Sequence, residues 1–594
     1  MDGARADAGQ SQRLAAQDRL VRRLAGALSR SGPVQCHETH ISWVLVAGGC
    51  AYKFKKAVHF DFVDFSTLAA RRFYCEEELR LNRRLAPELY LAVVPVTGSV
   101  DAPELQDEGG PDSSSDSSLT DTSSHGGHEP GFDGNAAAGP GAGFQRGGHL
   151  PARDWQSEGN LPSERPEADE AIEYAVKMRA FEQDALWSTR LHTGRLGREE
   201  IDQLAVLVAD FHAHAPAAPP ETGWGSARVQ RAIADENIAT IARLLRGDAH
   251  THVLARLKEW DAAETPRMAS LIDARKAAGF VRECHGDLHA GNIVTTSGKV
   301  QVFDCIEFNE RMRWIDVIND IAFACMDLSA RGRSDYSTRL LNAWLEESGD
   351  YAGLALLRYY LTQRALVRCK VASLRVRQHE DAATTDAAWR EAADYLALAA
   401  RCTDVPAPFV GVMHGFSGSG KSYLSLLLAE ASGAIRLRSD VERKRLHGLA
   451  ATTRGGAKLY ARSASEAVYA LLARRTRQIV EAGYPVIVDA AFLKRAQRDI
   501  LRQAAMRLGV PFLIVDVQTS QSTMEARVAA RSRAGSDASD ADLAVLRRQL
   551  ASDEPLAADE RDLAVRVTCE SGGEQEALAR VLARLPRGYA DAAR

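Results

Sequence analysis

One short stretch constrains the fold more than any other, because residues 415–422 read GFSGSGKS. This is a complete match to the phosphate-binding P-loop pattern, in which glycines let successive backbone N–H groups converge on phosphate oxygens. The apolar run at 409–415 predicts a strand before it, and the run after it predicts a helix whose N-terminal dipole favours the same anion. Further apolar runs at 484–492 and 511–517 predict strands, so we expect an α/β domain with a parallel sheet over residues 409–594.

The P-loop assigns chemical roles to its own residues. The ammonium group of Lys421 would reach the β- and γ-phosphates of a nucleotide, and the hydroxyl of Ser422 would ligate Mg²⁺. We expect ATP with Mg²⁺ as the cofactor of this domain. The residues expected to cradle its phosphates are Gly415, Ser417, Gly418, Ser419, Gly420, Lys421 and Ser422.

Charged residues after the P-loop indicate which reaction it serves. Asp440 and Arg443 follow the strand-like IRLR, Asp489 ends a predicted strand, and Arg527 and Arg531 lie in EARVAARSR. This set resembles the small P-loop kinases of the gluconate, adenylyl-sulfate and polynucleotide kinase group and of the zeta-toxin type. The resemblance implies that Asp440 activates the acceptor hydroxyl, that Arg443 holds the acceptor and that Asp489 is a Walker B-like acid. It also implies that the arginines form a lid over the transition state, and a solvated helix face is the alternative for them.

A second motif lies earlier in the chain, where residues 285–292 read HGDLHAGN. Asp287 is followed five residues later by Asn292, which is the Asp-to-Asn step of the protein-kinase catalytic loop. Asp304 then ends the predicted strand VQVFD. Phosphoryl transfer needs a carboxylate that accepts the proton of the attacking hydroxyl, which suits Asp287. It also needs oxygen ligands for Mg²⁺, which suits Asn292 and Asp304.

This motif resembles the loop of the aminoglycoside phosphotransferase and choline kinase family. The resemblance covers residues 34–100 and 171–400 and implies a kinase-like α+β fold with a β-rich N-lobe and a helical C-lobe. It implies Asp287 as the catalytic base, with His285 and Asp320 as supports of the loop.

The same family uses a strand lysine that reaches the nucleotide phosphates and pairs with a helix glutamate. In AYKFKK we favour Lys53, because Ala-Tyr-Lys best matches the Val-Ala-Ile-Lys motif, and Lys55 is the alternative on the same strand face. On the following helix we favour Glu78, since the leucines three and seven residues later mark an inward face. The alternatives on that helix are Glu76 and Glu77.

Composition divides the chain into segments. Residues 101–170 hold 15 acidic and 3 basic residues, a net charge of −12, and they are rich in Ser, Gly, Asp and Pro. Such a segment buries too little apolar surface to offset its ordering entropy, so we predict a disordered acidic insert. In chain order we expect a helical segment at 1–33, a kinase-like domain at 34–400 that contains this insert, a Pro-containing linker at 401–408 and the P-loop domain at 409–594. The linker leads us to expect that the two sites bind nucleotide independently.

The order of the two motif sets resembles a bacterial family described as an aminoglycoside phosphotransferase-like protein fused to an AAA-type or P-loop ATPase. By that resemblance we expect a bifunctional ATP-dependent phosphotransferase that acts on small hydroxylated acceptors. In one alternative, one domain is a regulatory nucleotide-binding module that controls the other. In another, the C-terminal domain phosphorylates polynucleotide 5′ ends.

Composition also limits the expected partners and compartment. The net charge of −5 lacks the field of a general nucleic-acid binder, although residues 409–594 carry 28 basic and 21 acidic residues, or +7, which permits such a partner there. No uninterrupted apolar run reaches 18 residues and no secretory signal is visible, so we expect no membrane partner. The nine cysteines include no Cys-x-x-Cys pair, which fits a reducing cytoplasm.

Overall fold

The chain forms two compact units. The computed structural model describes residues 2–594 except 61–62, 108–170, 246, 377–381, 452, 454, 456–458, 460, 535–538, 571 and 587–594. The first unit comprises residues 1–76 and 91–180, and the second comprises residues 77–90 and 181–594. Most of the predicted acidic insert lies outside the described residues. Its first seven residues are described and contain the short strand β7 (Pro103–Leu105).

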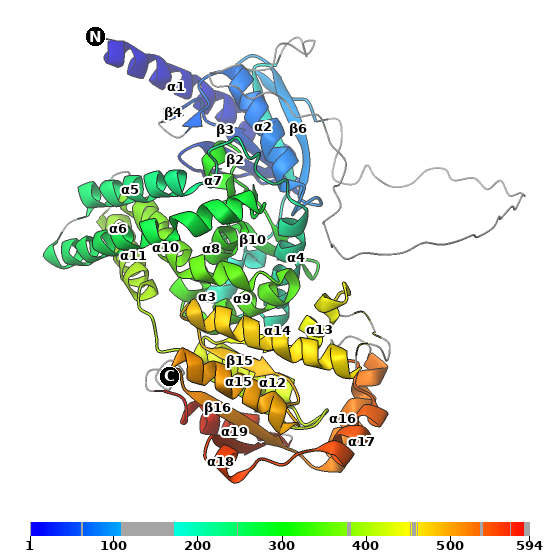
Figure 1. Cartoon of the computed structure of the whole chain (residues 1–594). Coiled ribbons are helices and arrows are strands. Elements are labelled where there is room, and N and C mark those ends of the chain that lie inside the picture. The colour runs from blue at the N-terminus through cyan, green and yellow to red at the C-terminus, as the bar shows by residue number, and fades with distance from the viewer. Residues whose placement is uncertain are drawn as a thin grey trace, which may run out of the picture. The chain divides into compact units, whose positions relative to one another are not determined.

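The first unit is built on a six-stranded sheet with a helix packed against it (Figure 1). In spatial order its strands are β1 (Gln35–Glu38), β2 (Ser42–Ala47), β3 (Cys50–Lys55), β8 (Glu173–Arg179), β6 (Tyr90–Gly98) and β7. A separate hairpin joins β4 (His59–Phe60) to β5 (Val63–Asp64). Helix α1 (Asp2–Leu28) buries Leu20 and Leu24 against Trp43 and Phe54 of the sheet. In the chain, β1 to β6 precede the insert and β8 follows it.

A buried polar network joins four elements of the first unit, α1, α2 (Leu68–Asn82), β3 and β8. Gln17 of α1 donates to Glu173 of β8 and to the carbonyl of Lys55, both at 2.7 Å. Arg71 of α2 donates to the same glutamate at 2.9 Å. Because every group in the network has a partner, the desolvation cost of burying this charge pair is offset.

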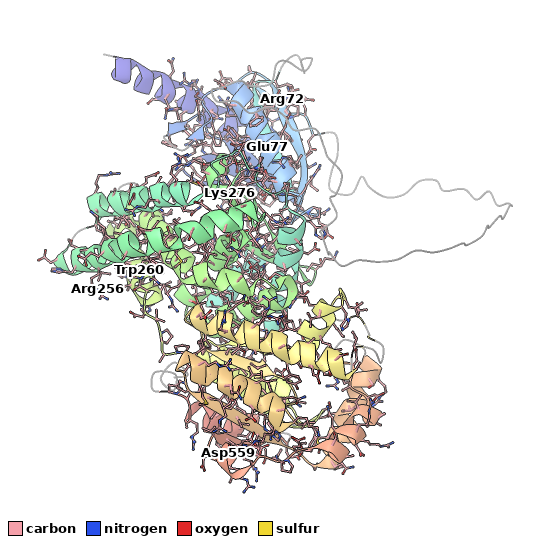
Figure 2. All side chains as sticks on the ribbon, in the orientation of Figure 1. Arg72, Glu77, Arg256, Trp260, Lys276 and Asp559 are labelled. Atoms are coloured by element: carbon pink, nitrogen blue, oxygen red, sulfur yellow. The ribbon has the colours of Figure 1, made fainter. Side chains whose placement is uncertain are left out.

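The helical region, residues 181–402, opens the second unit. Its helices are η1 (Gln183–Ala185), α3 (Trp187–His192), α4 (Arg198–His214), α5 (Ala227–Leu244), α6 (Asp248–Ala277), η2 (Ala290–Asn292), α7 (Glu310–Arg313), α8 (Val317–Ala330), α9 (Ser334–Ser348), η3 (Tyr351–Gly353), α10 (Leu354–Arg375) and α11 (Ala382–Cys402). Two small antiparallel pairs interrupt them: β9 (Val281–Glu283) with β12 (Trp314–Asp316), and β10 (Ile293–Thr296) with β11 (Lys299–Val302). Trp260 of α6, which is labelled in Figure 2, lies on one of the longest helices of this region. Its ring stacks on that of Tyr359 of α10 and so ties two long helices together.

The P-loop domain, residues 409–594, has the predicted parallel sheet. Its five strands lie in the order β14 (Ile435–Arg438), β15 (Val486–Asp489), β13 (Val410–His414), β16 (Phe512–Gln518) and β17 (Ala564–Thr568). Helices α12 (Lys421–Ser432) and α19 (Glu574–Leu582) cover one face, and α14 (Arg462–Glu481) and α15 (Arg495–Leu508) cover the other (Figure 1). The remaining helices are α13 (Ser439–Leu446), α16 (Gln521–Ala534), α17 (Leu543–Ser552) and α18 (Ala558–Arg561).

The helical region and the P-loop domain share one hydrophobic core. Buried residues of α9, such as Leu341 and Leu345, belong to the same cluster as Ile435 and Leu437 of β14. Asn342, which is 1% exposed, pairs with the outer edge of β14. Its Nδ2 donates to the carbonyl of Ala434 at 3.0 Å, and its Oδ1 accepts the backbone N–H of Arg436 at 2.6 Å. One amide side chain therefore replaces a neighbouring strand along this edge, and the linker does not separate two free bodies.

We expect Asn342→Leu to lower the free energy of unfolding by about 2–4 kcal/mol, because it leaves a buried carbonyl and a buried N–H on β14 without partners. Hydrogen exchange of the peptide that covers Arg436 should accelerate. The matched control is Asn237→Leu, a buried asparagine of α5 that bonds to Lys370 within the helical region. Unchanged exchange at Arg436 in Asn342→Leu would contradict this account of the edge.

Candidate functional site

The predicted catalytic loop lies between β9 and β10 and presents Asp287. The Asp287 side chain is 35% exposed, and its Oδ2 lies 3.3 Å from Nε2 of His289 and 3.1 Å from Nδ2 of Asn292. His289 Nδ1 accepts the N–H of Gly291, so Nε2 carries the proton that faces Asp287. The amide group of Asn292 also donates to the Asp287 carbonyl at 3.0 Å, which fixes the five-residue loop on itself.

The electrostatics of the loop favour an ionised Asp287. Burial alone would raise the pKa of this carboxyl, but the adjacent His289 imidazole with its hydrogen bond, and the charge of Arg368, hold its pKa well below the usual range. Asp287 is therefore a carboxylate at neutral pH and can accept a proton.

Asp320 holds the same loop through its backbone, in the bracing position that the resemblance implied. Its two carboxylate oxygens accept the backbone N–H groups of His285 at 3.1 Å and Gly286 at 2.9 Å. His285 is itself a structural support, because its Nδ1 accepts the N–H of Asp287 and its Nε2 donates to the carbonyl of Phe303. Burial lowers the pKa of His285, which keeps the ring neutral in this arrangement.

Two residues that the sequence did not single out hold Asp320 in place. Trp344 of α9 donates to Nδ1 of His212 at 3.2 Å, so His212 Nε2 carries a proton and donates to Asp320 at 3.1 Å. The pKa of Asp320 is lowered to about 2, chiefly by His212 acting against burial. Cys284 lies near these groups, but both ring nitrogens of His212 are already engaged, which leaves none for a metal ion. Burial raises the pKa of the Cys284 thiol, as befits a small core residue.

The predicted metal ligands fit Mg²⁺ by their donor chemistry. The amide nitrogen of Asn292 donates to Asp287, so its amide oxygen, Oδ1, faces away from these bonds and can ligate a cation. Asp304 lies two residues past the end of β11 with φ +63°, a conformation that costs energy in a residue other than glycine and is often found at functional sites. Its backbone N–H donates to the hydroxyl of Tyr90, which holds this turn. The two side chains therefore fit a metal bound to nucleotide phosphates.

Among the three candidate glutamates of α2, only Glu78 is buried. Glu76 pairs with Arg72, and Glu77 pairs with Arg80. Burial therefore favours the inward orientation predicted for Glu78. Lys53 belongs to the first unit and Glu78 to the second, so their ion pair stays a prediction, as does the choice between Lys53 and Lys55.

Two arginines on α10 flank the catalytic loop and were missed from the sequence. Arg364 donates to the carbonyl of Gly286 at 3.0 Å, and Arg368 lies 3.5 Å from Nε2 of His289. They are four residues apart and so share a helix face. In the sequence they sit in an ordinary amphipathic pattern, and only the packing of α10 on the loop shows their role.

The P-loop has the geometry that its sequence predicts. Gly415, Gly418 and Gly420 have φ of +142°, +83° and +99°. A Cβ atom at Gly415 would lie 2.6 Å from the carbonyl oxygen of Val517, and one at Gly418 would lie 2.6 Å from that of Met524. Only glycine is accommodated at these positions without strain. The hydroxyl of Ser419 is buried and has no hydrogen-bond partner among the described residues, which suits a loop that binds phosphate oxygens.

Lys421 lies among the predicted acids. Burial lowers its pKa to about 8, and the nearby carboxylates of Asp489 and Asp440 oppose that effect. Its ammonium donates to the carbonyl of Phe416 at 2.6 Å, while Ser422 is exposed at the start of α12. Asp489 ends β15, the strand beside the P-loop strand, and is buried. Lys421, Ser422, Asp440 and Asp489 thus fit a Mg²⁺-nucleotide.

The three predicted arginines occupy different environments. Arg527 reaches the P-loop, where it lies 3.5 Å from the carbonyl of Gly418. Arg531 donates to the carbonyl of Ala541 and acts on Lys421 electrostatically. Arg443 is buried, and its guanidinium donates to the carbonyl of Leu459 at 3.1 Å. The roles of these arginines as lid and acceptor ligand stay predictions.

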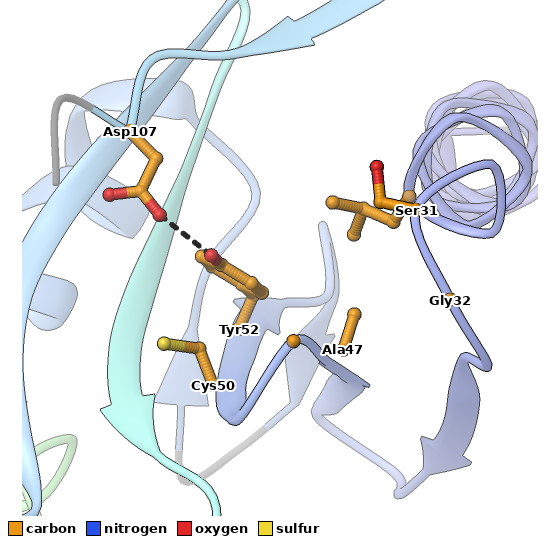
Figure 3. Close-up of a pocket in the computed structure, with 8 residues that line it drawn as sticks. Ser31, Gly32, Ala47, Cys50, Tyr52 and Asp107 are labelled. Atoms are coloured by element: carbon orange, nitrogen blue, oxygen red, sulfur yellow. Dashed lines mark hydrogen bonds between the residues drawn. The ribbon is translucent and has the colours of Figure 1, made fainter. Parts of the chain in front are cut away.

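A small pocket of about 170 Å³ lies elsewhere, in the first unit (Figure 3). It is lined by Leu28, Ser31, Gly32, Ala47, Gly48, Cys50, Tyr52 and Asp107. The hydroxyl of Tyr52 donates to Asp107 at 2.7 Å across it. None of the predicted site residues lines this pocket. In the described part of the chain, no helix is both long and apolar enough to cross a membrane.

Comparisons with known proteins agree with the two sites. Residues 171–357 match the phosphotransferase enzyme family, and residues 410–556 match an AAA domain family. Uncharacterized proteins of Mycobacterium tuberculosis and Mycobacterium bovis are 26% identical over 513 residues, which are 85% of this chain and 88% of theirs.

Solved structures with partial similarity include two kinases. A gluconokinase from Sinorhizobium meliloti is 26% identical with a TM-score of 0.22, and the match covers 29% of this chain and 91% of the gluconokinase. The APS kinase of Mycobacterium tuberculosis, solved with AMPPNP and APS, is 19% identical with a TM-score of 0.23, and the match covers 30% of this chain and 96% of that one. The two family matches identify the chain as an ATP-dependent kinase-type enzyme in which a phosphotransferase-family region precedes a P-loop domain.

Proposed function

We propose that the chain is a bifunctional phosphotransferase that uses ATP with Mg²⁺ at two sites. The first site transfers the γ-phosphate to a hydroxyl of a small molecule, within a kinase-like fold of a β-rich N-lobe and a helical C-lobe. The P-loop site binds and hydrolyses ATP or phosphorylates a second small hydroxylated acceptor. One observation carries the proposal: an ionised, partly exposed Asp287 is held beside Asn292 on a loop that Asp320 braces.

In the first site the protein positions groups rather than forming covalent bonds. Asp287 accepts the proton of the acceptor hydroxyl as the oxygen attacks phosphorus. Asn292 and Asp304 would hold the Mg²⁺, which would neutralise charge on the phosphates. Asp320 and His285 keep Asp287 in register with the acceptor, because they hold the backbone N–H groups of residues 285–287.

In the second site Lys421 holds the transferring phosphate and Asp440 activates the acceptor. Ser422 and Asp489 would hold the metal ion. Arg443 binds the acceptor, and Arg527 with Arg531 screens charge at the lid. We propose a cytoplasmic enzyme with small-molecule partners, in line with its charge and cysteine pattern.

We expect Asp287→Asn to reduce first-site turnover by about 10²–10⁴-fold, because the amide keeps the shape but cannot take up a proton. Nucleotide affinity should stay nearly unchanged, since the metal ligands remain. Turnover is measured in a Lys421→Ala background that silences the second site, and affinity is measured by calorimetry.

Asp304→Asn serves as the comparison, because it removes a charged metal ligand and should weaken Mg²⁺-nucleotide binding as well as turnover. Loss of binding in Asp287→Asn but not in Asp304→Asn would invert the two roles. Turnover unchanged by both would make the first site a pseudo-kinase.

The lowered pKa of Lys421 predicts that nucleotide binding at the second site takes up a proton. Between about pH 8 and pH 10 the free amine is partly neutral, and bound phosphate favours the charged form. Affinity should therefore fall as pH rises from about 7 to about 9.5. Calorimetry in two buffers of different ionisation enthalpy measures the proton uptake. The second-site contribution is the difference between wild type and Lys421→Ala.

The matched control is Lys421→Arg, which keeps a positive charge at every pH in this range. Its affinity should not change over the interval, even if it is weaker. A wild-type affinity that is constant from about pH 7 to about pH 9.5 would contradict the prediction.

The shared core of the helical region and the P-loop domain favours one alternative. In that alternative, nucleotide at one site controls the other, and only one site transfers phosphate. The Asp287→Asn and Lys421→Ala variants separate the two, because a regulatory site changes the other site's turnover without forming a phosphorylated product of its own.

A further inference from the structure

We propose that Glu346, which belongs to the helical region, is a positioning residue of the P-loop site. The inference rests on the proposed Mg²⁺-nucleotide site at Lys421 and goes beyond it. It means that the second site is completed by a side chain from outside the P-loop domain.

Glu346 lies at the last turn of α9 and faces β14. Its side chain is 10% exposed. Its Oε1 accepts hydrogen bonds from Nε and Nη2 of Arg436 at 2.9 and 2.7 Å. Its Oε2 accepts one from Nη1 of Arg438 at 3.3 Å. Two arginines that alternate along one strand point to the same face, so one carboxylate can hold both.

Each arginine in turn reaches a predicted metal-binding element. Arg436 donates from Nη1 to the carbonyl of Ser422 at 3.3 Å. This bond fixes the first turn of α12, which carries the hydroxyl of Ser422. Arg438 is the register partner of Asp489, and its Nε lies 3.9 Å from Oδ2 of that carboxylate. Arg438 also directly precedes α13, which carries Asp440.

The distance between Arg438 and Asp489 is the important detail. At 3.9 Å the guanidinium does not form a direct hydrogen bond, so this oxygen of Asp489 stays available to a cation. Glu346 restrains the guanidinium from the other side. Without the negative charge of Glu346, Arg438 would close on Asp489 as a charge-assisted pair and compete with Mg²⁺ for it.

The same interface contains a matched pair of contacts at the opposite end of α12 from the P-loop. Glu430, near the end of α12, also holds two arginines: Arg339 at 2.7 Å and Arg198 at 3.3 Å. Its side chain is 4% exposed, so it is at least as buried as that of Glu346. Glu430 therefore tests the general effect of removing an interface carboxylate.

The experiment compares the two variants in the full chain, with a non-hydrolysable ATP analogue titrated by calorimetry at varied Mg²⁺ and in EDTA. Second-site binding is the part that Lys421→Ala removes. Glu346→Gln should raise the Mg²⁺ concentration for half-maximal binding by about five- to tenfold, the range of coupling within one charge network. Binding in EDTA should not change, and Glu430→Gln should leave both quantities unchanged.

A second variant distinguishes positioning from mere structural support. Arg438→Gln in the Glu346→Gln background should restore the wild-type Mg²⁺ dependence, because it removes the competing cation. Arg438→Gln alone should lower the Mg²⁺ requirement, and it carries the test if Glu346→Gln does not fold. A structural loosening would instead make the double variant worse.

Three results would overturn the inference. They are an equal loss of nucleotide affinity in Mg²⁺ and in EDTA for Glu346→Gln, the same loss of affinity in Glu430→Gln, or no rescue of the Mg²⁺ dependence in the double variant. The failure of the proposed site itself looks different. In that case Lys421→Ala would remove no binding at all, whatever residue stands at 346.

Discussion

The structure of the second unit depends on how α9 satisfies the buried outer edge of β14. An edge strand carries backbone donors and acceptors that must find partners when they are buried. Asn342 supplies those partners through one amide group, and Glu346, one turn later, neutralises the two arginines on the same strand. A polar edge becomes a specific interface in this way, because only a helix with these two side chains at this spacing matches it. The shared core behind it adds apolar burial without directional preference.

Helix α9 also reaches the other site, through its opposite side. Trp344 fixes the tautomer of His212, which then donates to the Asp320 that holds the catalytic loop. Trp344 is fully buried and lies between Asn342 and Glu346 in the sequence. The same two turns of helix thus support the loop that carries Asp287, the proposed base, and, through β14, the end of the sheet where we propose that the second site binds Mg²⁺. Contacts alone do not prove energetic coupling, which requires that the helix have two arrangements that both sites bias.

Local motifs made much of both sites predictable. The P-loop and the Asp287-to-Asn292 step each lie within one short run of consecutive residues. Their spacing therefore predicts the chemistry that they serve and the strand or helix beside them. The strands and the parallel sheet followed from short apolar runs, as at 484–492, where β15 is found. The supports of the sites could not be predicted in that way. His212 and Trp344 are 132 positions apart, and Glu346 and Arg436 are 90 apart. In the sequence Glu346 is one of two glutamates in NAWLEESG, and nothing local distinguishes it from a solvated helix residue. The positive φ of Asp304 likewise has no local signal in the sequence, because no glycine occupies this position, and its backbone N–H bonds to Tyr90, 214 positions away.

The linker at 401–408 suggested two independent nucleotide sites, and the interface gives a physical reason to doubt that independence. A flexible connection leaves two domains free to reorient, whereas a buried interface fixes one orientation. Glu346, Arg436 and Glu430 are all buried at this interface, so separating the domains would expose charges that now have partners. Hydration of the separated charges would offset part of the lost attraction between them. For this reason exposed ion pairs contribute little to stability, and buried ones specify geometry more than they stabilise. The charges at this interface therefore act mainly on orientation. They hold β14, and with it Arg438 and the start of α13, in one position relative to the P-loop.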